Sequence, residues 1–546
     1  MRQHLNFSFS LPLLFCLALL SCQSASNANQ SSADQSDTPQ EASQIDVVTY
    51  HYNPTRQGVN QSESSLTPAT VNSSTFGKLR FFSSDGMVDA QPLYVSGLSI
   101  GQQAHDVLYV VTENDSVYAF DADNGNRLWQ VSALAPGEVP SDDQGCNLIS
   151  PKIGITATPV IDRTKGPNGA IYLVAMSKDP DGNYHQRLHA FDLASGAELF
   201  GGPQDIEASY PGTGDGSQGG QVIFNPGQYA ERAALLESAG ILYMSFTSHC
   251  DVRPYTGWVM AYDAATLQQT SVLNLTPNGS QGAIWMSGGG LAADSQGFIY
   301  LLAGNGTFDT TLDGQGFPVN GDYGNGMLKI SPSPQMTVAD YFEPYDTLSE
   351  SDSDLDLGSG GVLVLPDLQD SSGAVHHLLA AAGKNTHIYV ANRDSMGKFN
   401  PNDNSNAYQD LDGALSGGSW STPAYFNGTL YYGTPNGPLQ AFPVTGARLS
   451  ATPSSRTTAT FHYPGATPTV SANGTSQAIV WAVENTNPAV LHAYDATNLA
   501  IELYNSNQAN TRDQFGPAFR FVAPVVANGR VFVGAPGGVA EFGLLR

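Results

Sequence analysis

The sequence predicts an all-β fold, an eight-bladed β-propeller of four-stranded antiparallel blades. First, a unit of about 25 residues, made of short strands and tight turns, recurs along the chain. Second, its turns carry Asn, Asp and Gly, which tolerate the backbone angles of tight reversals. Third, the 546 residues include 57 Gly and 33 Pro, and only 13% are charged. Such a composition is typical of a turn-rich β protein and excludes a coiled coil or a mostly disordered chain.

The clearest copy of the unit spans residues 106–129. Residues 107–111 are an apolar, β-branched run of strand length, and residues 116–120 and 127–131 are two further strands separated by turns. Together they predict one antiparallel meander. Alone, this sheet leaves an apolar face in water, so it needs copies of itself to pack against.

The copies are recognised by two short signatures. An Ala–aromatic–Asp step recurs at 119–121, 190–192, 261–263 and 493–495. A second signature, most often a small residue and Thr before Pro, leads into an apolar strand at 90–92, 157–159, 421–423, 466–468 and 522–524. We count about eight units at a period of roughly 50 to 70 residues, which indicates a propeller.

This unit resembles the repeat of the pyrroloquinoline-quinone (PQQ) propeller proteins, in which Ala–aromatic–Asp, a turn with Gly and a terminal Trp close each blade. The resemblance covers residues 46–546, and the first blade matches best. Residues 49–82 resemble the family's N-terminal strap, which implies that residues 77–82 add an outer strand to the last blade, at 531–542. Closing the ring in this way removes exposed sheet edges.

The N-terminal residues are predicted to be a targeting signal for export and not a part of the folded domain. An apolar run at 11–20 follows Arg2 and His4 and is too short to span a bilayer. Ser21 and Cys22 come directly after it. Residues 1–21 resemble a bacterial lipoprotein signal, with Cys22 as the lipidated residue; the alternative is an ordinary signal peptide with a chance cysteine. Residues 22–45 are polar and predict a disordered tether. We therefore expect a protein anchored by its lipid to the periplasmic face of the outer membrane or to the cell surface.

The net charge of −27 argues against nucleic acid and against an anionic membrane surface as partners. Contact with a membrane is therefore expected through the lipid only. The charge serves either solubility or a channel mouth that attracts cations. We expect a monomer whose further partner is a small-molecule substrate or an envelope protein.

Two cysteines remain in the mature chain, Cys146 and Cys250, and both lie in polar loop sequences. In an exported protein this predicts a disulfide between them, with Cα atoms about 4.4 to 6.8 Å apart; two free thiols are the alternative. The spacing matches neither a metal cluster nor a haem-attachment Cys-x-x-Cys-His.

The resemblance implies a site for PQQ and calcium, in which an Asn and an acidic side chain bind the cation and an Asp acts as base. Asn305, in a Gly-Asn loop after a strand, matches the metal-binding Asn. Asp251 is the candidate acidic ligand, about one residue out of register. Asp354 and Asp356 are the candidate bases, with Leu355 where the family has Trp.

Lys384, just before a strand, matches the basic residue that contacts the quinone carbonyls. Two features depart from the family. Its vicinal cysteine pair, which covers one face of the quinone, is missing from this sequence. Its stacking Trp is replaced by Leu291 and Ala292, so Trp285, before the glycines, is the candidate wall, with Trp420 as an alternative.

Each of these residues also has a purely structural interpretation. Asn305 lies in Gly-Asn-Gly, which forms ordinary hairpin turns, and Lys384 is followed by Asn in another turn-like pair. The loop at 400–413 alternates Asp and Asn like a calcium loop, but its last ligand is wrongly spaced, so we interpret it as a surface loop.

The sequence therefore leaves two functions open. One is a non-catalytic binding or scaffold propeller of the cell envelope, favoured narrowly by the missing Trp and cysteine pair. The other is a calcium-dependent PQQ dehydrogenase that oxidises an alcohol or sugar, favoured by the order of Asn305, Asp356 and Lys384.

Overall fold

The computed structural model describes residues 45–517 and 520–545. The predicted signal peptide, Cys22 and the tether up to residue 44 lie outside these ranges. In the described part strands dominate, and the one α-helix there, α1 (Thr347–Asp352), has 6 residues. None of the helices in this part has the length and apolar character that crossing a membrane requires. The predicted all-β class is confirmed.

The predicted first unit forms an antiparallel sheet of β3 (Leu93–Ile100), β4 (Gln103–Val111), β5 (Ser116–Asp121) and β6 (Arg127–Ser132). Its last three strands contain the three runs expected from the sequence. The second sheet consists of β7 (Val139–Pro140), β8 (Val160–Asp162), β9 (Ala170–Lys178), β10 (Tyr184–Asp192) and β11 (Gln204–Asp205). The third consists of β15 (Tyr229–Glu231), β16 (Leu236–Ser238), β17 (Ile241–Ser248), β18 (Trp258–Asp263) and β19 (Gln269–Asn274).

The middle of the chain continues the pattern. One sheet contains β20 (Ala292–Ala293), β21 (Ile299–Leu302), β22 (Met327–Ile330), β23 (Val338–Glu343) and β29 (Lys398–Phe399). The next contains β24 (Leu363–Val364), β27 (Leu378–Ala381), β28 (Ile388–Asn392) and β30 (Gln409–Leu411). It is followed by β31 (Ala424–Phe426), β32 (Thr429–Gly433), β33 (Leu439–Thr445), β34 (Arg448–Leu449) and β35 (Ser455–Arg456).

The last sheets include strands from both ends of the chain. β36 (Thr469–Asn473), β37 (Ser476–Glu484), β38 (Val490–Asp495) and β39 (Glu502–Asn505) are joined by β1 (Val59–Asn60). β40 (Val525–Ala527) and β41 (Arg530–Leu544) are joined by β2 (Phe76–Met87). Small excursions form two further sheets from β12 (Ser209–Pro211), β13 (Ser217–Gln218) and β14 (Gln221–Ile223), and from β25 (Leu368–Gln369) and β26 (Val375–His376).

Consecutive large sheets contact one another through their inner strands, as the blades of a propeller do. The contacting pairs are β8 with β16, β16 with β20, β20 with β24, β31 with β36 and β36 with β40. Side chains such as Trp258 and Trp481 are completely buried in the cores of these sheets. The number of blades, eight, stays a prediction from the repeat count.

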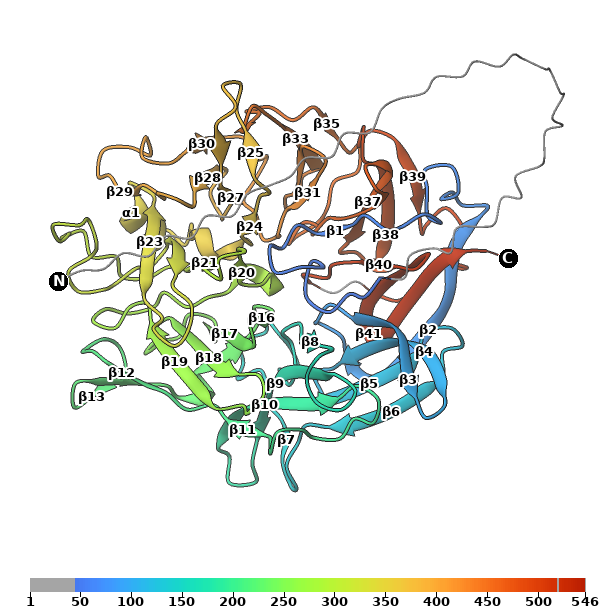
Figure 1. Ribbon diagram of the computed structural model, residues 1–546, viewed down its shortest axis with the longest axis horizontal. Coiled ribbons are helices and arrows are strands. Elements are labelled where there is room, and N and C mark those ends of the chain that lie inside the picture. The colour runs from blue at the N-terminus through green and yellow to red at the C-terminus, as the bar shows by residue number, and fades with distance from the viewer. Residues whose placement is uncertain (1–44, 518–519, 546) are drawn as a thin grey trace, which may run out of the picture. The chain divides into compact units, whose positions relative to one another are not determined.

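The predicted closure by the N-terminal strap is confirmed. β2 pairs antiparallel with β41, with Gly77 opposite Gly543 and Phe82 opposite Val539. In Figure 1 the blue β2 lies beside the red β41. β2 therefore covers the outer edge of β41 and is itself the outermost strand of the last sheet.

The segment before β2 crosses the inner strands of most sheets. Val47 pairs with Tyr94 of β3, and Val59 pairs with Val470 of β36. Between them, backbone carbonyls of the segment accept hydrogen bonds from four more sheets, in the donor–acceptor pairs Ile161–Val48, Ala293–Pro54, Val364–Thr55 and Tyr425–Gln57. One short stretch of chain thus holds the inner strands together.

Arg56 lies at the centre of this strap and is completely buried. Its Nε donates to the carbonyl of Leu291 at 2.8 Å, and Nη2 donates to the carbonyl of Leu235 at 3.0 Å. Nη1 donates to Thr49 Oγ1 and to the carbonyl of Tyr50. The guanidinium therefore joins the strap to two neighbouring sheets.

A buried histidine in the sheet of β36–β39 predicts a dependence of stability on pH. His492 contacts Glu502 at 2.7 Å and Glu484 at 3.4 Å on the neighbouring strands. Burial lowers the pKa of His492, but the two carboxylates raise it by more, so it lies above its ordinary value. The stability that charged His492 gives the fold through these carboxylates is therefore fully present below about pH 6.5, the ordinary pKa of His. It is lost as pH rises through the raised pKa of His492.

We expect a His492→Gln variant to be less stable than the wild type by about 1–3 kcal/mol at pH 6, since hydrogen bonds to charged groups are lost. Denaturant unfolding at pH 6 and pH 9 measures this difference, which should narrow at the higher pH. A difference that is constant or grows with pH contradicts the assignment.

Candidate active site

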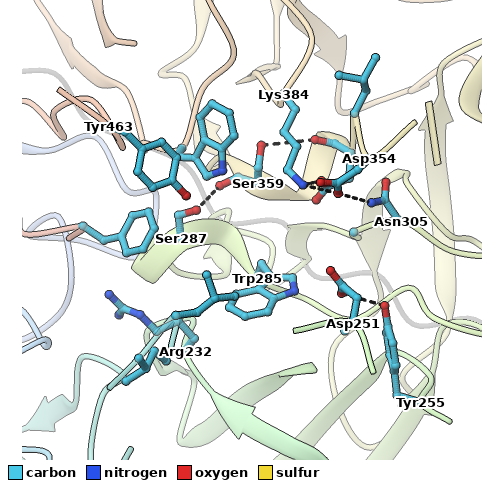
Figure 2. A pocket seen from close by; sticks show the side chains of 18 residues that line it. Arg232, Asp251, Tyr255, Trp285, Ser287, Asn305, Asp354, Ser359, Lys384 and Tyr463 are labelled. Carbon is cyan, nitrogen blue, oxygen red and sulfur yellow. Dashed lines mark hydrogen bonds and ion pairs between the residues drawn. The ribbon is translucent and has the colours of Figure 1, made fainter. Parts of the chain in front are cut away.

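A cavity of about 460 Å³ lies among the loops of several sheets. Every side chain proposed from the sequence for catalysis, metal or cofactor lines it, together with the alternative wall residue: Asp251, Trp285, Asn305, Asp354, Asp356, Lys384 and Trp420. Figure 2 shows the labelled members around one space. Residues from 251 to 420 in the sequence thus meet at one place.

The repeat explains why three of them meet. Asp251 lies between β17 and β18, Asn305 between β21 and β22, and Lys384 between β27 and β28. In each of the three sheets, this loop joins the second strand of the sheet order to the third. Equivalent loops of consecutive blades lie on one face of a propeller, so the topology brings these side chains together.

The charged groups form a chain of contacts. Lys384 Nζ lies 2.7 Å from Asp356 Oδ1 and also donates to Asp354 Oδ1. Asn305 Nδ2 donates to the same Asp354 oxygen at 2.8 Å. Figure 2 shows Lys384, Asp354 and Asn305 pointing toward one another. Lys384 thus links the two candidate bases, and Asp354 links Lys384 to the candidate metal ligand.

The two aspartates differ in environment. The Asp356 side chain is 5% exposed, whereas that of Asp354 is 70% exposed. Burial raises the pKa of Asp356 to about 6, and Lys384 opposes this shift. For Lys384, burial lowers the pKa, but Asp356 and Asp354 raise it by more, so Lys384 stays charged. Asp356 therefore has the burial and the poised pKa that suit a general base.

Asn305 has an oxygen without a partner. Asn305 Oδ1 is buried and accepts no hydrogen bond among the described residues, while its Nδ2 is held by Asp354. The Asp251 carboxylate accepts from Ser248 Oγ at 2.9 Å and from Tyr255 OH at 2.8 Å, which fixes its orientation at the cavity. Amide and carboxylate oxygens are the donors that calcium takes.

The oxygen donors of the cavity do not make a ready cage for a metal. Within residues 45–517 and 520–545, no group of three or more His, Cys, Asp or Glu side chains is arranged to hold a metal ion. A cation here would take oxygens from Asn305 and Asp251, and the remaining ones from its ligand or from water.

Trp285 contributes an aromatic wall from a strained turn. Met286, Ser287 and Gly288, directly after it, have φ of 44°, 46° and 79°. This left-handed backbone is uncommon for Met and Ser, and such strain clusters at functional sites. Ser287 Oγ donates to the carbonyl of Ser359 at 2.6 Å and holds the turn against the next sheet. Leu291 and Ala292, the positions matching the family's Trp, are completely buried and do not line the cavity.

Several lining residues carry no signal in the sequence. The loop after Cys146 brings Leu148 and Ile149 to the cavity, and distant segments bring Tyr463 and Phe521. Arg232 also lines it, completely buried, with Nη1 bonded to the carbonyl of Thr156 at 3.1 Å.

Cys146 and Cys250 form a disulfide with Cα atoms 5.5 Å apart, across 104 residues of sequence. The bond joins the loop that carries Leu148 and Ile149 to the loop that carries Asp251. Two lining segments from different sheets are therefore held together at the cavity.

Reducing this disulfide should loosen both loops and lower the free energy of unfolding by about 2–4 kcal/mol. Hydrogen exchange should accelerate at residues 143–152 and 249–255, while the central strands β9 and β17 stay protected. A variant with Ser at both cysteines is the control, because reductant should not change it further. Unchanged exchange in the reduced wild type would contradict this role.

No family model matches the chain, and no curated protein matches it. Solved structures do. The quinohemoprotein alcohol dehydrogenase of Comamonas testosteroni superposes with a TM-score of 0.60 at 14% identity, covering 91% of this chain and 80% of that one. Quinohemoprotein alcohol dehydrogenase ADHIIG of Pseudomonas putida HK5 gives 0.56 at 13% identity over 91% and 80%. The chain has the quinoprotein dehydrogenase fold.

A europium-containing methanol dehydrogenase has this quinoprotein fold as well, with a TM-score of 0.58 at 12% identity, covering 91% of this chain and 90% of that one. At such identities the likeness establishes the fold alone. The chemistry of this chain depends on the residues of its own cavity.

Proposed function

We propose that this protein binds a PQQ-type quinone with a divalent cation in the cavity and oxidises an alcohol or sugar. One observation carries the proposal: Asn305, Asp356 and Lys384 come from three loops and meet in one cavity of about 460 Å³ that Trp285 also lines. The repeat brings their loops together, but it does not require that these loops present an amide, a buried carboxylate and an ammonium group to one cavity.

The residues present fit such a ligand. The unpartnered Asn305 Oδ1 and the oriented Asp251 carboxylate would hold the cation. Trp285, with Leu148 and Ile149 on the disulfide-linked loop, offers apolar surface to a planar ring. When bound, the quinone supplies the two-electron acceptor that oxidation of an alcohol to a carbonyl requires.

The side chains of this chain then have definite tasks. Asp356 takes the proton of the substrate hydroxyl, since its carboxylate is buried and its pKa, raised to about 6, lies near neutrality. Lys384 stabilises negative charge that develops beside it and keeps Asp356 ionised at working pH. The apolar and aromatic lining excludes water from these groups.

Calorimetry with PQQ and Ca²⁺ tests binding, and reduction of a dye with a panel of alcohols and sugars tests turnover. An Asn305→Ala variant should weaken cation binding about tenfold or more. Because a methanol dehydrogenase of this fold contains europium, Eu³⁺ luminescence is a second readout of the cation that does not depend on turnover. Asp403→Asn, in an exposed loop, is the matched control. Absence of binding heat and of dye reduction would reject the enzyme.

The second candidate is a binding or scaffold propeller of the envelope. Two observations favour it. Lys384 is already paired with both Asp354 and Asp356, and the described residues contain no group of three or more His, Cys, Asp or Glu side chains arranged to hold a metal ion. Binding of PQQ without turnover in the same experiment would support it.

Export and a lipid anchor at Cys22 belong to the proposal. The Cys146–Cys250 disulfide supports an oxidising compartment. Labelling of cells with a tagged fatty acid should mark the wild type and leave a Cys22→Ser variant unmarked; equal labelling of the two would reject the anchor.

A further inference from the structure

A buried carboxylate behind the cavity joins the loops of Asp356 and Lys384. Glu350, on α1, is 5% exposed and does not line the cavity. Its Oε1 accepts from Asn385 Nδ2 at 2.6 Å, and its Oε2 accepts from Asn325 Nδ2 at 3.0 Å. Asn385 follows Lys384 directly in the chain, so one arm of Glu350 reaches the lysine loop.

The other arm reaches the aspartate loop. Asn325 Oδ1 accepts the backbone N–H of Leu357, the residue after Asp356, at 2.6 Å. The backbone of Glu350 also accepts from Leu355 N at 2.9 Å. The two loops themselves meet where Lys384 N donates to the carbonyl of Asp356 at 3.0 Å. Glu350 is therefore the common support of the two loops.

Both asparagines are fixed with their nitrogens toward Glu350. The Asn325 oxygen is occupied by Leu357 N, and the Asn385 oxygen accepts from His387 N at 3.2 Å. Neither amide can turn over without placing two donors against each other. The group between them must therefore accept at both ends, which an ionised carboxylate does and a Gln amide does not.

We propose that Glu350 is a positioning residue that sets Asp356 against Lys384 through Asn325 and Asn385. The effect of Glu350 on catalysis rests on the proposed function. Its effect on the geometry of Lys384 does not depend on that function. Removing the outer partners of metal ligands typically costs about 10- to 100-fold in activity, and we expect a loss of the same order when the support of Asp356 and Lys384 is removed.

The charges around Glu350 agree with this role. Burial raises the pKa of Glu350 to about 7, Asp346 adds to this rise, and Asn385, Asn325 and His387 oppose it. Burial raises the pKa of Glu343, on the adjoining β23, and that of Tyr389, on β28, and Glu350 adds to both rises. As pH falls through about 7, protonation removes one of the two acceptors, so the support weakens on the acid side.

The test exchanges donor and acceptor in the hydrogen bond between Asn385 and Glu350. Glu350→Gln places an amide nitrogen against one asparagine, and adding Asn385→Asp to it restores an acceptor opposite that nitrogen with the same net charge. Reactivity of Lys384 toward trinitrobenzenesulfonate, measured by mass spectrometry of its peptide across pH, reads the geometry without any ligand. Asp352→Asn, exposed on the same helix, is the control.

We expect Lys384 labelling to rise severalfold in Glu350→Gln, to return toward wild type in the double variant and to stay unchanged in the control. With PQQ, Ca²⁺ and an alcohol, kcat should fall about 10- to 100-fold in the single variant and recover in the double one. If Glu350→Gln is unfolded, Asn385→Asp alone takes its place in the test. This variant puts a second carboxylate against Glu350, so it should also raise the labelling of Lys384.

Unchanged Lys384 labelling in folded Glu350→Gln, or increased labelling without recovery in the double variant, overturns the inference. A wild type without turnover rejects the proposed function alone, because the labelling result still decides the role of Glu350.

Discussion

Replacing Asp356 with Asn should lower kcat/KM for alcohol oxidation by about 10²- to 10⁴-fold, the contribution typical of a general base. The amide keeps the size of the side chain but cannot take the hydroxyl proton. PQQ and cation affinities should change little, because the predicted cation ligands are Asn305 and Asp251. Dye-reduction kinetics and calorimetry on the same preparation separate the two effects.

The acid limb of the pH profile should report Asp356, together with the weakening of the Glu350 support below about pH 7. Burial raises the pKa of Asp356 to about 6, so kcat/KM of the wild type should fall as pH drops through 6 and the carboxylate becomes protonated. Asp354→Asn is the matched control, since its side chain is 70% exposed and a smaller loss is expected. If the Asp356→Asn variant keeps the wild-type rate and pH profile, Asp356 is not the base.

Arg56→Leu should lower the free energy of unfolding by about 4 kcal/mol or more, because breaking a buried hydrogen-bond network is one of the few changes that cost this much. The guanidinium is completely buried and satisfies three carbonyls and one hydroxyl, on the strap and on two sheets. Each acceptor left without a partner costs about 1–3 kcal/mol. Denaturant unfolding followed by tryptophan fluorescence measures the loss.

The control for Arg56 is Arg163, which pairs with Asp46 of the strap at 2.6 Å but is 37% exposed. Arg163→Leu should cost at most about 1 kcal/mol, as surface ion pairs do. Equal losses for the two variants would contradict the central role of Arg56.

The parts of the molecule that depend on the repeat were predictable from the sequence. The three strands of the first unit and the pairing of β2 with β41 follow from local periodicity and from the family's strap. Asn305 and Lys384 were found because they match the family's site motifs, and the repeat explains why they meet, since it places equivalent loops together.

The rest of the site depends on contacts between segments with no shared pattern. Leu148 and Tyr463 reach the cavity from long loops whose course the strand periodicity does not determine. Trp285 was expected as a wall of the site, but the left-handed turn that follows it, at Met286 and Ser287, was not. Glu350 lies behind the site on a helix of 6 residues in an otherwise β chain, and its role emerges only from the two amides that face it.

The strap also has a consequence for the order of folding. Asn60 Nδ2 bonds to the carbonyl of Val526, 466 residues later, so the first described part of the chain cannot reach its final contacts until almost the whole polypeptide has been made. Contacts of such separation slow folding, because a very long loop must close before they form. Once formed, the β2–β41 seam must open before the ring can come apart. We therefore expect a protein that folds late and unfolds slowly, with a lifetime governed by the rate of that opening.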